Sequence, residues 1–268
     1  MTGGDLKIER LCKFWRLLKT DLYRAFISFG FLLGAVVSAA ILFYGSLQDS
    51  SSNAVIRFLN SFVWGNVIDL FFLADSLAYS ACFASEWQSG FYRPIIARSN
   101  PRAYALSKCI STAIASGASV MVGVAAFIAY ICINCAEIVP EANVIYGEVP
   151  IFYEFLYADL PFCFFSAYLF IVFMQAAFFG VLGLCVSGYF PNKYVAYVSP
   201  YVFSFVVNQT ANALKLPNNF DPVKMAMGRL FGASAAVVIG WIFIYFTLLT
   251  LLCSALFIRR VKRSVANA

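Results

Sequence analysis

The sequence contains no histidine, and this absence excludes several kinds of catalytic site. Most serine and cysteine nucleophiles rely on a histidine base, and the common zinc-protease helix carries two histidines. The sequence also lacks the pattern Gly-x-x-x-x-Gly-Lys-Ser/Thr, with which many ATPases bind phosphate. We therefore expect no catalytic residue, no metal site and no cofactor bound by this chain, and we do not expect it to be an enzyme.

Charge is scarce as well. Only 12% of the 268 residues are charged, whereas 62% are hydrophobic and 18% are aromatic. One soluble core of this size could not bury so much apolar surface, so the composition predicts a membrane protein. A helix needs about 20 apolar residues to cross about 30 Å of hydrocarbon. Six runs meet that length, at 25–44, 62–84, 109–132, 162–186, 195–214 and 233–257.

The fifth run is the least regular of the six. It holds Pro200 near its middle and ends in the polar residues Asn208, Gln209 and Thr210, so it is expected to be shorter or broken. Charge placement nevertheless favours six spans. An even number of spans puts most of the cations on one side, and loops on the cytoplasmic side of a membrane are rich in lysine and arginine.

The cations are distributed very unevenly along the chain. Fifteen of the nineteen lysines and arginines lie in the N-terminal segment, in 86–108, near residue 193 or in the C-terminal tail. The loop 133–161 carries five carboxylates and no cation. The sequence therefore predicts an all-α polytopic protein with both termini in the cytoplasm. The formal charge of +6 is then explained by cations that lie on the cytoplasmic side of the membrane, next to anionic lipid. We therefore expect no nucleic-acid partner.

The N-terminal segment 6–22 is expected to form an amphipathic helix at the membrane surface. Apolar residues recur on one stripe, and charged residues lie on the other side. The stripe consists of Ile8, Leu11, Trp15, Leu18 and Leu22. This helix is either a general anchor for the first span or a specific docking element. The first apolar run begins too late for a signal peptide, so none is expected.

A few unusual residues lie inside the expected spans. Asp69 and Asp75 fall in the second run, where a carboxylate is costly unless it is paired, wetted or protonated. One interpretation is that they line a solute path or form a cation site. The other is that Asp69 lies near the outer interface of the membrane and Asp75 forms a hydrogen bond with a neighbouring helix. Gly30 and Gly34 form a GxxxG pair in the first run, which predicts close helix packing.

Cysteines are scattered through or beside the expected spans. Only Cys132 and Cys135 have a suggestive spacing, at the outer end of the third run. A lone CxxC pair is weak support for a redox site. Whether the two thiols form a disulfide is left open.

The segment 86–108 interrupts two apolar runs and carries four cations against one carboxylate. It begins with Glu86, has Gly90 four residues later and ends with Lys108 before the next run. The aromatic and basic residues between them are Tyr92, Arg93, Arg98, Arg102 and Tyr104. We expect this segment to turn at Gly90 and to be held at the membrane surface by its tyrosines. Glu86 is expected to fix the turn by accepting hydrogen bonds from its backbone or from a cation.

This pattern resembles the coupling helix of the membrane subunits of ABC-2 type transporters. In that family a glutamate, a glycine and a basic and apolar stretch ending in tyrosine and lysine join the second and third spans. The half-transporters of the eukaryotic G subfamily have a similar string. The amphipathic first helix, the six spans and the length also fit, so the resemblance covers nearly the whole chain. The long acidic loop 133–161 departs from many relatives.

The resemblance implies a single transmembrane domain, 1–268, in the bacterial plasma membrane. It implies an exporter permease that moves a peptide antibiotic, a drug or a lipid, and that pairs with a second copy or a related permease. Two copies of a separate ATPase subunit would bind ATP and Mg²⁺ and act on the coupling residues in 86–108. The alternatives are a standalone cation channel or carrier that uses Asp69 or Asp75, and a structural component of a membrane complex. If the chain has no ATPase partner, 86–108 is a positive loop that serves only to set topology.

Overall fold

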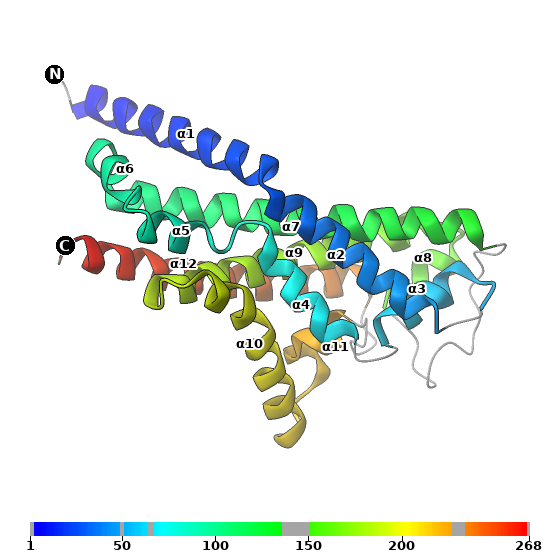
Figure 1. The fold of residues 1–268 in the computed structure, drawn as a ribbon. Coiled ribbons are helices and arrows are strands. Elements are labelled where there is room, and N and C mark those ends of the chain that lie inside the picture. The colour runs from blue at the N-terminus through cyan, green and yellow to red at the C-terminus, as the bar shows by residue number, and fades with distance from the viewer. Residues whose placement is uncertain (1–2, 49–50, 64–66, 136–150, 227–233, 267–268) are drawn as a thin grey trace.

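The computed structural model describes residues 3–48, 51–63, 67–135, 151–226 and 234–266 (Figure 1). All the extended regular elements in these ranges are helices. They are α1 (Gly3–Ile27), α2 (Phe29–Ser46), α3 (Ala54–Val63), α4 (Val67–Leu77), α5 (Cys82–Gln88), α6 (Tyr92–Arg98), α7 (Pro101–Asn134), α8 (Tyr153–Tyr157), α9 (Pro161–Tyr189), α10 (Lys193–Ala213), the 3₁₀ turn η2 (Asn218–Phe220), α11 (Pro222–Ala226) and α12 (Ala235–Ala266).

Four of these helices are long and apolar enough to cross a membrane. They are α2, α7, α9 and α12, and they contain most of the first, third, fourth and sixth expected runs. In the bundle α7 packs against α2 and α9, and α9 packs against α12. Since four helices of this kind occur in the part of the chain that the structure describes, the protein has the character of a multi-pass membrane protein.

The helix of the first expected span, α2, begins later than the apolar run 25–44. The chain leaves α1 at Ile27, and Ser28 caps the start of α2, where its side chain accepts a hydrogen bond of 3.1 Å from the backbone N–H of Phe31. Residues 25–27 therefore belong to α1. This helix is also longer than the predicted segment 6–22, and it ends against the N-terminal half of α7.

The second expected span, 62–84, is not one continuous helix. Residues 64–66 lie outside the described part, and the helix that follows ends at Leu77, before a turn at 78–81 that leads into α5. The turn is bonded to neighbouring parts of the bundle. The Ser28 hydroxyl donates to the backbone carbonyl oxygen of Ala78 at 3.1 Å, and the Ser80 side chain donates to the carbonyl oxygen of Gly180 in α9 at 2.9 Å. The Ser28 bond replaces one bond of the lost helical ladder, and the Ser80 bond ties the turn to α9, so the break is tolerated inside the bundle.

The fifth expected run, 195–214, forms the single helix α10, with Pro200 inside it. It is not among the four apolar candidates, because the polar side chains near its C-terminal end lower its hydropathy. In Figure 1 this helix runs obliquely away from the long helices of the bundle. Its outward side exposes Val198, Val202 and Val206.

The GxxxG pair brings helices of the same chain together. A Cβ atom at Gly30 would collide with the carbonyl oxygens of Leu77 and Ala78, and one at Gly34 would lie 2.6 Å from Oγ of Ser119. The predicted packing role is therefore confirmed, with α4 and α7 as the partners of α2.

Candidate functional site

The segment between α5 and α7 is a compact helical elbow at the end of the bundle where α1 begins and α12 ends (Figure 1). The chain turns at Gly90, as predicted, with a φ of +72° that L side chains rarely adopt. After α6 the side chain of Asn100 caps α7 by accepting a 3.0 Å hydrogen bond from the N–H of Arg102. Pro101 then occupies the first turn of α7, where a missing N–H costs nothing.

This start of α7 corrects the expected boundaries of the elbow. The helix that contains the third expected run, α7, begins at Pro101. Tyr104 and Lys108 therefore belong to its first two turns and not to the segment that precedes it. Both side chains are completely buried. Tyr92 is also buried, at 6% exposure. The tyrosines hold the elbow through contacts inside the protein.

A buried polar cluster joins the elbow to the rest of the bundle. We call it the Lys108 cluster, and it consists of Asp21 of α1, Tyr79 of the turn after α4, Glu86 of α5, and Tyr104, Ser107 and Lys108 of α7. The Lys108 side chain has no exposed surface, whereas those of Asp21 and Glu86 are 2% and 12% exposed.

The Lys108 ammonium group uses its three N–H donors within this cluster. Its Nζ lies 2.8 Å from Oδ1 of Asp21, 2.6 Å from Oε1 of Glu86 and 3.4 Å from the Tyr79 hydroxyl. A buried ion group is tolerated when its charges are paired and its remaining hydrogen-bonding atoms are satisfied.

The remaining oxygens of the two carboxylates are satisfied as well. Tyr104 donates to Oε2 of Glu86 at 2.5 Å, and Ser107 donates to Oδ2 of Asp21 at 2.6 Å. Arg24 lies 4.0 Å from Glu86 at the rim of the cluster. Glu86 therefore fixes the elbow by pairing with the Lys108 ammonium group. A bond to a cation was one of the two interactions that the sequence predicted for Glu86, the other being a bond from the backbone.

The sequence interpretation did not include Tyr79, Ser107 or Asp21 among the site residues, and Asp21 is the charged member among these three. It lies on the side of α1 that also carries the buried residues Leu18 and Ala25. The predicted apolar stripe of this helix is split, because Leu11 and Trp15 remain 57% and 64% exposed while Leu18 is buried. The signal was Lys108 itself, since a lysine within a long apolar helix requires a carboxylate partner from elsewhere.

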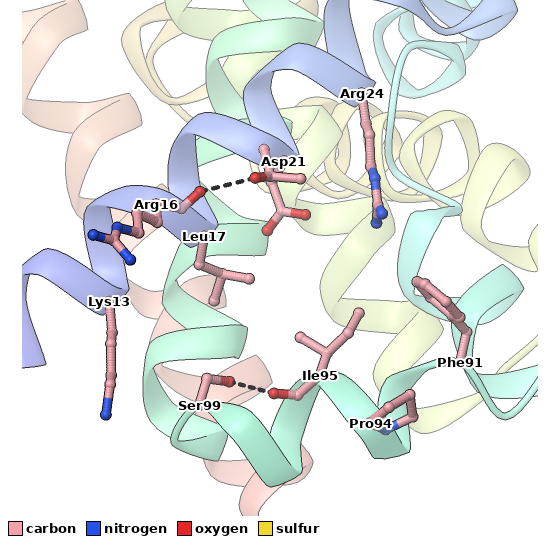
Figure 2. Close-up of a pocket in the computed structure, with 10 residues that line it drawn as sticks. Lys13, Arg16, Leu17, Asp21, Arg24, Phe91, Pro94, Ile95 and Ser99 are labelled. Atoms are coloured by element: carbon pink, nitrogen blue, oxygen red, sulfur yellow. Dashed lines mark hydrogen bonds between the residues drawn. The ribbon is translucent and has the colours of Figure 1, made fainter.

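The outer face of α6 is left uncovered. Trp87 and Tyr92 stack with their ring centroids 4.3 Å apart, and this contact folds α6 back onto α5. Phe91, Arg93, Pro94 and Ala97 are exposed, and Phe91 and Pro94 face α1 across a pocket that the two helices line (Figure 2). The elbow thus presents a surface of mixed apolar and positive character.

The predicted basic residues of the elbow lie on different elements, with Arg93 and Arg98 in α6 and Arg102 in α7. Arg93 Nε lies 3.5 Å from the Tyr92 hydroxyl, and this hydrogen bond raises the pKa of Arg93 above its usual value. Arg102 is exposed at the start of α7. Arg98 ends α6, but its side chain lies outside the described part of the structure.

The two aspartates of the second expected span do not form a described pair. Asp69 lies in α4, with its side chain outside the described residues. Asp75 is completely buried, and its carboxyl oxygens have no hydrogen-bond partner among the described residues. The equally buried amide group of Gln175 in α9 faces this carboxyl group, but the two side chains do not reach the geometry of a regular hydrogen bond. Buried polar groups are nearly always bonded, so this place in the bundle is exceptional.

All eight cysteines are free thiols, so Cys132 and Cys135 are not joined.

No family model matches the sequence, and comparisons with curated proteins and with solved structures find no match. A function for the chain therefore has to be argued from its own residues.

Proposed function

We propose that this chain is the membrane permease subunit of an ATP-driven ABC exporter and that α6 is its coupling helix. Two copies of a separate ATPase subunit would bind ATP and Mg²⁺. A second copy of this chain, or a related permease, would complete the path. The cargo class that suits apolar and aromatic spans is an amphipathic or hydrophobic molecule, such as a peptide antibiotic, a drug or a lipid.

The observation that carries this proposal is the combination of an exposed α6 with a rigid attachment beneath it. A coupling element has to contact a soluble partner, and α6 exposes Phe91, Arg93 and Pro94. It also has to transmit movement to the spans. The Lys108 cluster joins α1, α5 and α7 directly beside this helix. A displacement of α6 would therefore be transmitted to several helices at once.

The course of the chain supports six passages through the membrane. In Figure 1, α2 and α7 run in the same direction, and α9 and α12 both run in the opposite one. The chain therefore has to return between the members of each pair. The broken α4 and α5 provide one return, and α10 lies in the other interval. Six passages with both termini in the cytoplasm agree with the positions of fifteen of the nineteen cations.

The test is co-purification of the tagged chain in mild detergent from its native host, followed by an assay of ATP hydrolysis. We expect a partner protein with a phosphate-binding loop. Arg93→Glu should release this partner, because it reverses the charge on the exposed face of α6. Arg259→Glu is the matched control, since Arg259 is also exposed and lies near the same end of the bundle. If both variants retain the partner, or if no ATPase is recovered, the proposal is wrong.

A second candidate function comes from Asp75. A carboxyl group that is fully buried without a hydrogen-bond partner is costly, and within a membrane such a group is a candidate for a cation or proton path. The chain would then be a standalone carrier. In liposomes that contain only this chain, Asp75→Asn should abolish cation uptake if this is its function. The exporter proposal expects no uptake by the unmodified chain under the same conditions.

A further inference from the structure

A buried polar junction lies where α4, α7 and α9 pack against one another. We call it the Asp75 junction, and it consists of Asp75 of α4, Ser116 of α7 and Gln175 of α9. All three residues are at most 1% exposed. None of their side-chain nitrogen and oxygen atoms has a hydrogen-bond partner among the described residues. Since buried polar atoms are nearly always bonded, three such side chains at one place indicate a ligand.

The polar groups of the junction lie close together. The Gln175 amide group faces the Asp75 carboxyl group. Gly180 of α9 lets the other two helices approach at the same place. A Cβ atom there would collide with the Ser116 hydroxyl oxygen and would lie 3.5 Å from the backbone carbonyl oxygen of Asp75. Asp75 is therefore close to polar groups of both α7 and α9.

The charge of Asp75 is not balanced by any side chain that the structure describes. No described lysine or arginine is paired with its carboxyl oxygens. Lys108, the buried cation of α7, uses its three N–H donors within its own cluster. Asp75 also lies in the last turn of α4, which ends at Leu77, and the C-terminal end of a helix carries a partial negative charge. A carboxylate at this place therefore requires a positive charge from solution.

That positive charge is either a proton or a metal ion. A protonated carboxyl group and an amide group each have a donor and an acceptor, so they can close two hydrogen bonds with each other. Asp75 and Gln175 face each other without forming either bond. Carboxylate, amide and hydroxyl oxygens are all ligands for hard metal cations. The arrangement therefore favours an ion that the oxygen atoms bind together.

We propose that the Asp75 junction binds a monovalent metal cation, for which Na⁺ is the probe. The Asp75 carboxylate balances its charge, and the Gln175 amide oxygen and the Ser116 hydroxyl oxygen are further ligands. A monovalent ion fits a single carboxylate, whereas Ca²⁺ takes about six to eight oxygen ligands and often several carboxylates. The C-terminal ends of broken membrane helices coordinate Na⁺ in transporters, and α4 ends at a break of this kind.

This inference rests on the same residue as the second candidate function, but it requires no ion to cross the membrane. The bound ion ties α4 to α7 and α9, in an exporter as well as in a carrier. The two ideas fail separately. Sodium binding without uptake in liposomes would exclude the carrier and leave the site in place. Uptake without sodium binding at Asp75 would exclude the site.

The test measures the unfolding temperature of the purified full-length chain in detergent. Sodium chloride replaces N-methylglucamine chloride stepwise, so the ionic strength stays constant. Sodium should raise the unfolding temperature by about 2–3 °C at about ten times its dissociation constant. Asp75→Asn removes the charge and nearly keeps the shape of the side chain, so it should abolish this response. Asp159→Asn makes the same change at an exposed aspartate and is the matched control, which should respond as the unmodified chain does.

Gln175→Met keeps the proposal testable if Asp75→Asn does not fold. It removes the amide ligand and should raise the sodium concentration of the half-maximal response by about tenfold. A response that is unchanged in Asp75→Asn or in Gln175→Met would overturn the proposal. An unmodified chain that does not respond to sodium would overturn it as well, and would assign a proton to Asp75.

Discussion

At the scale of single residues, Lys108 is the most consequential side chain of the elbow. Its ammonium group lies between the buried carboxylate of Asp21 and the largely buried carboxylate of Glu86. Removing one partner of a buried ion group leaves the other charges without compensation, and this costs more than the group contributes as a whole.

Lys108→Met is therefore expected to lower the free energy of unfolding by about 3–5 kcal/mol. The loss should appear in thermal or denaturant unfolding of the purified chain in detergent. Lys19→Met is the matched control, because Lys19 is exposed on α1. Adding Glu86→Gln to Lys108→Met should recover part of the loss, since it removes one uncompensated charge. A Lys108→Met chain as stable as the Lys19→Met chain would contradict the importance of the cluster.

Tyr104→Phe tests the second bond of Glu86. The change removes one hydroxyl group and leaves the buried ring in place, so the packing of α7 is preserved. A hydrogen bond to a charged group contributes about 1.5–3 kcal/mol, and a loss in that range is expected in the same unfolding experiment. Tyr44→Phe, at an exposed tyrosine of α2, should change the stability by much less.

At the scale of helices, the closest approach of α2 to α4 depends on Gly30. A methyl group there would meet two backbone carbonyl oxygens, and backbone cannot move aside as a flexible side chain can. Gly30→Ala should lower the free energy of unfolding by about 1–3 kcal/mol. Gly240→Ala is the control in α12, where nothing lies within 4 Å of the new methyl group. There the higher helix propensity of alanine should raise stability by about 0.5–1 kcal/mol. Equal effects at the two glycines would contradict this packing.

The helices differ in how far the sequence could predict them. Long apolar runs led to α2, α7, α9 and α12, because length and hydropathy are local properties. The break at 78–81 could not be predicted in the same way. The sequence Ala78-Tyr79-Ser80-Ala81 contains neither glycine nor proline. The turn is held by the Ser28 hydroxyl, which donates to the Ala78 carbonyl oxygen, and by the Ser80 side chain, which donates to α9. Such a break depends on packing, which a single sequence does not display.

The candidate site was predictable to a similar degree. The elbow was identified from Glu86, Gly90 and its cations, and the turn at Gly90 was confirmed by its positive φ. The partner Asp21 was missed because it is 87 residues away from Lys108 and lies on a helix that was interpreted only as an amphipathic anchor. Pairings of this kind require the tertiary structure.

At the scale of the whole molecule, two exposed cysteines report on its orientation. Cys12 lies in α1, near the end of the bundle that holds the elbow, whereas Cys163 begins α9 at the other end (Figure 1). If the termini are cytoplasmic, a membrane-impermeant maleimide should label Cys163 in intact spheroplasts and Cys12 in inverted vesicles. The variants Cys12→Ser and Cys163→Ser identify each signal. Labelling of Cys12 in intact spheroplasts would contradict the proposed orientation.

The 34 residues of α7 form one uninterrupted helix that begins beside the elbow and ends at Asn134. At 1.5 Å per residue it is about 50 Å long, well beyond the roughly 30 Å of membrane hydrocarbon. Lys108 fastens its second turn, Ser119 near its middle donates a 2.6 Å hydrogen bond to the carbonyl oxygen of Phe31 in α2, and its buried side chains continue as far as Ile131. Since α7 also packs against both α2 and α9, a displacement of this helix at the elbow would have to be shared by the two neighbouring helices over most of its length.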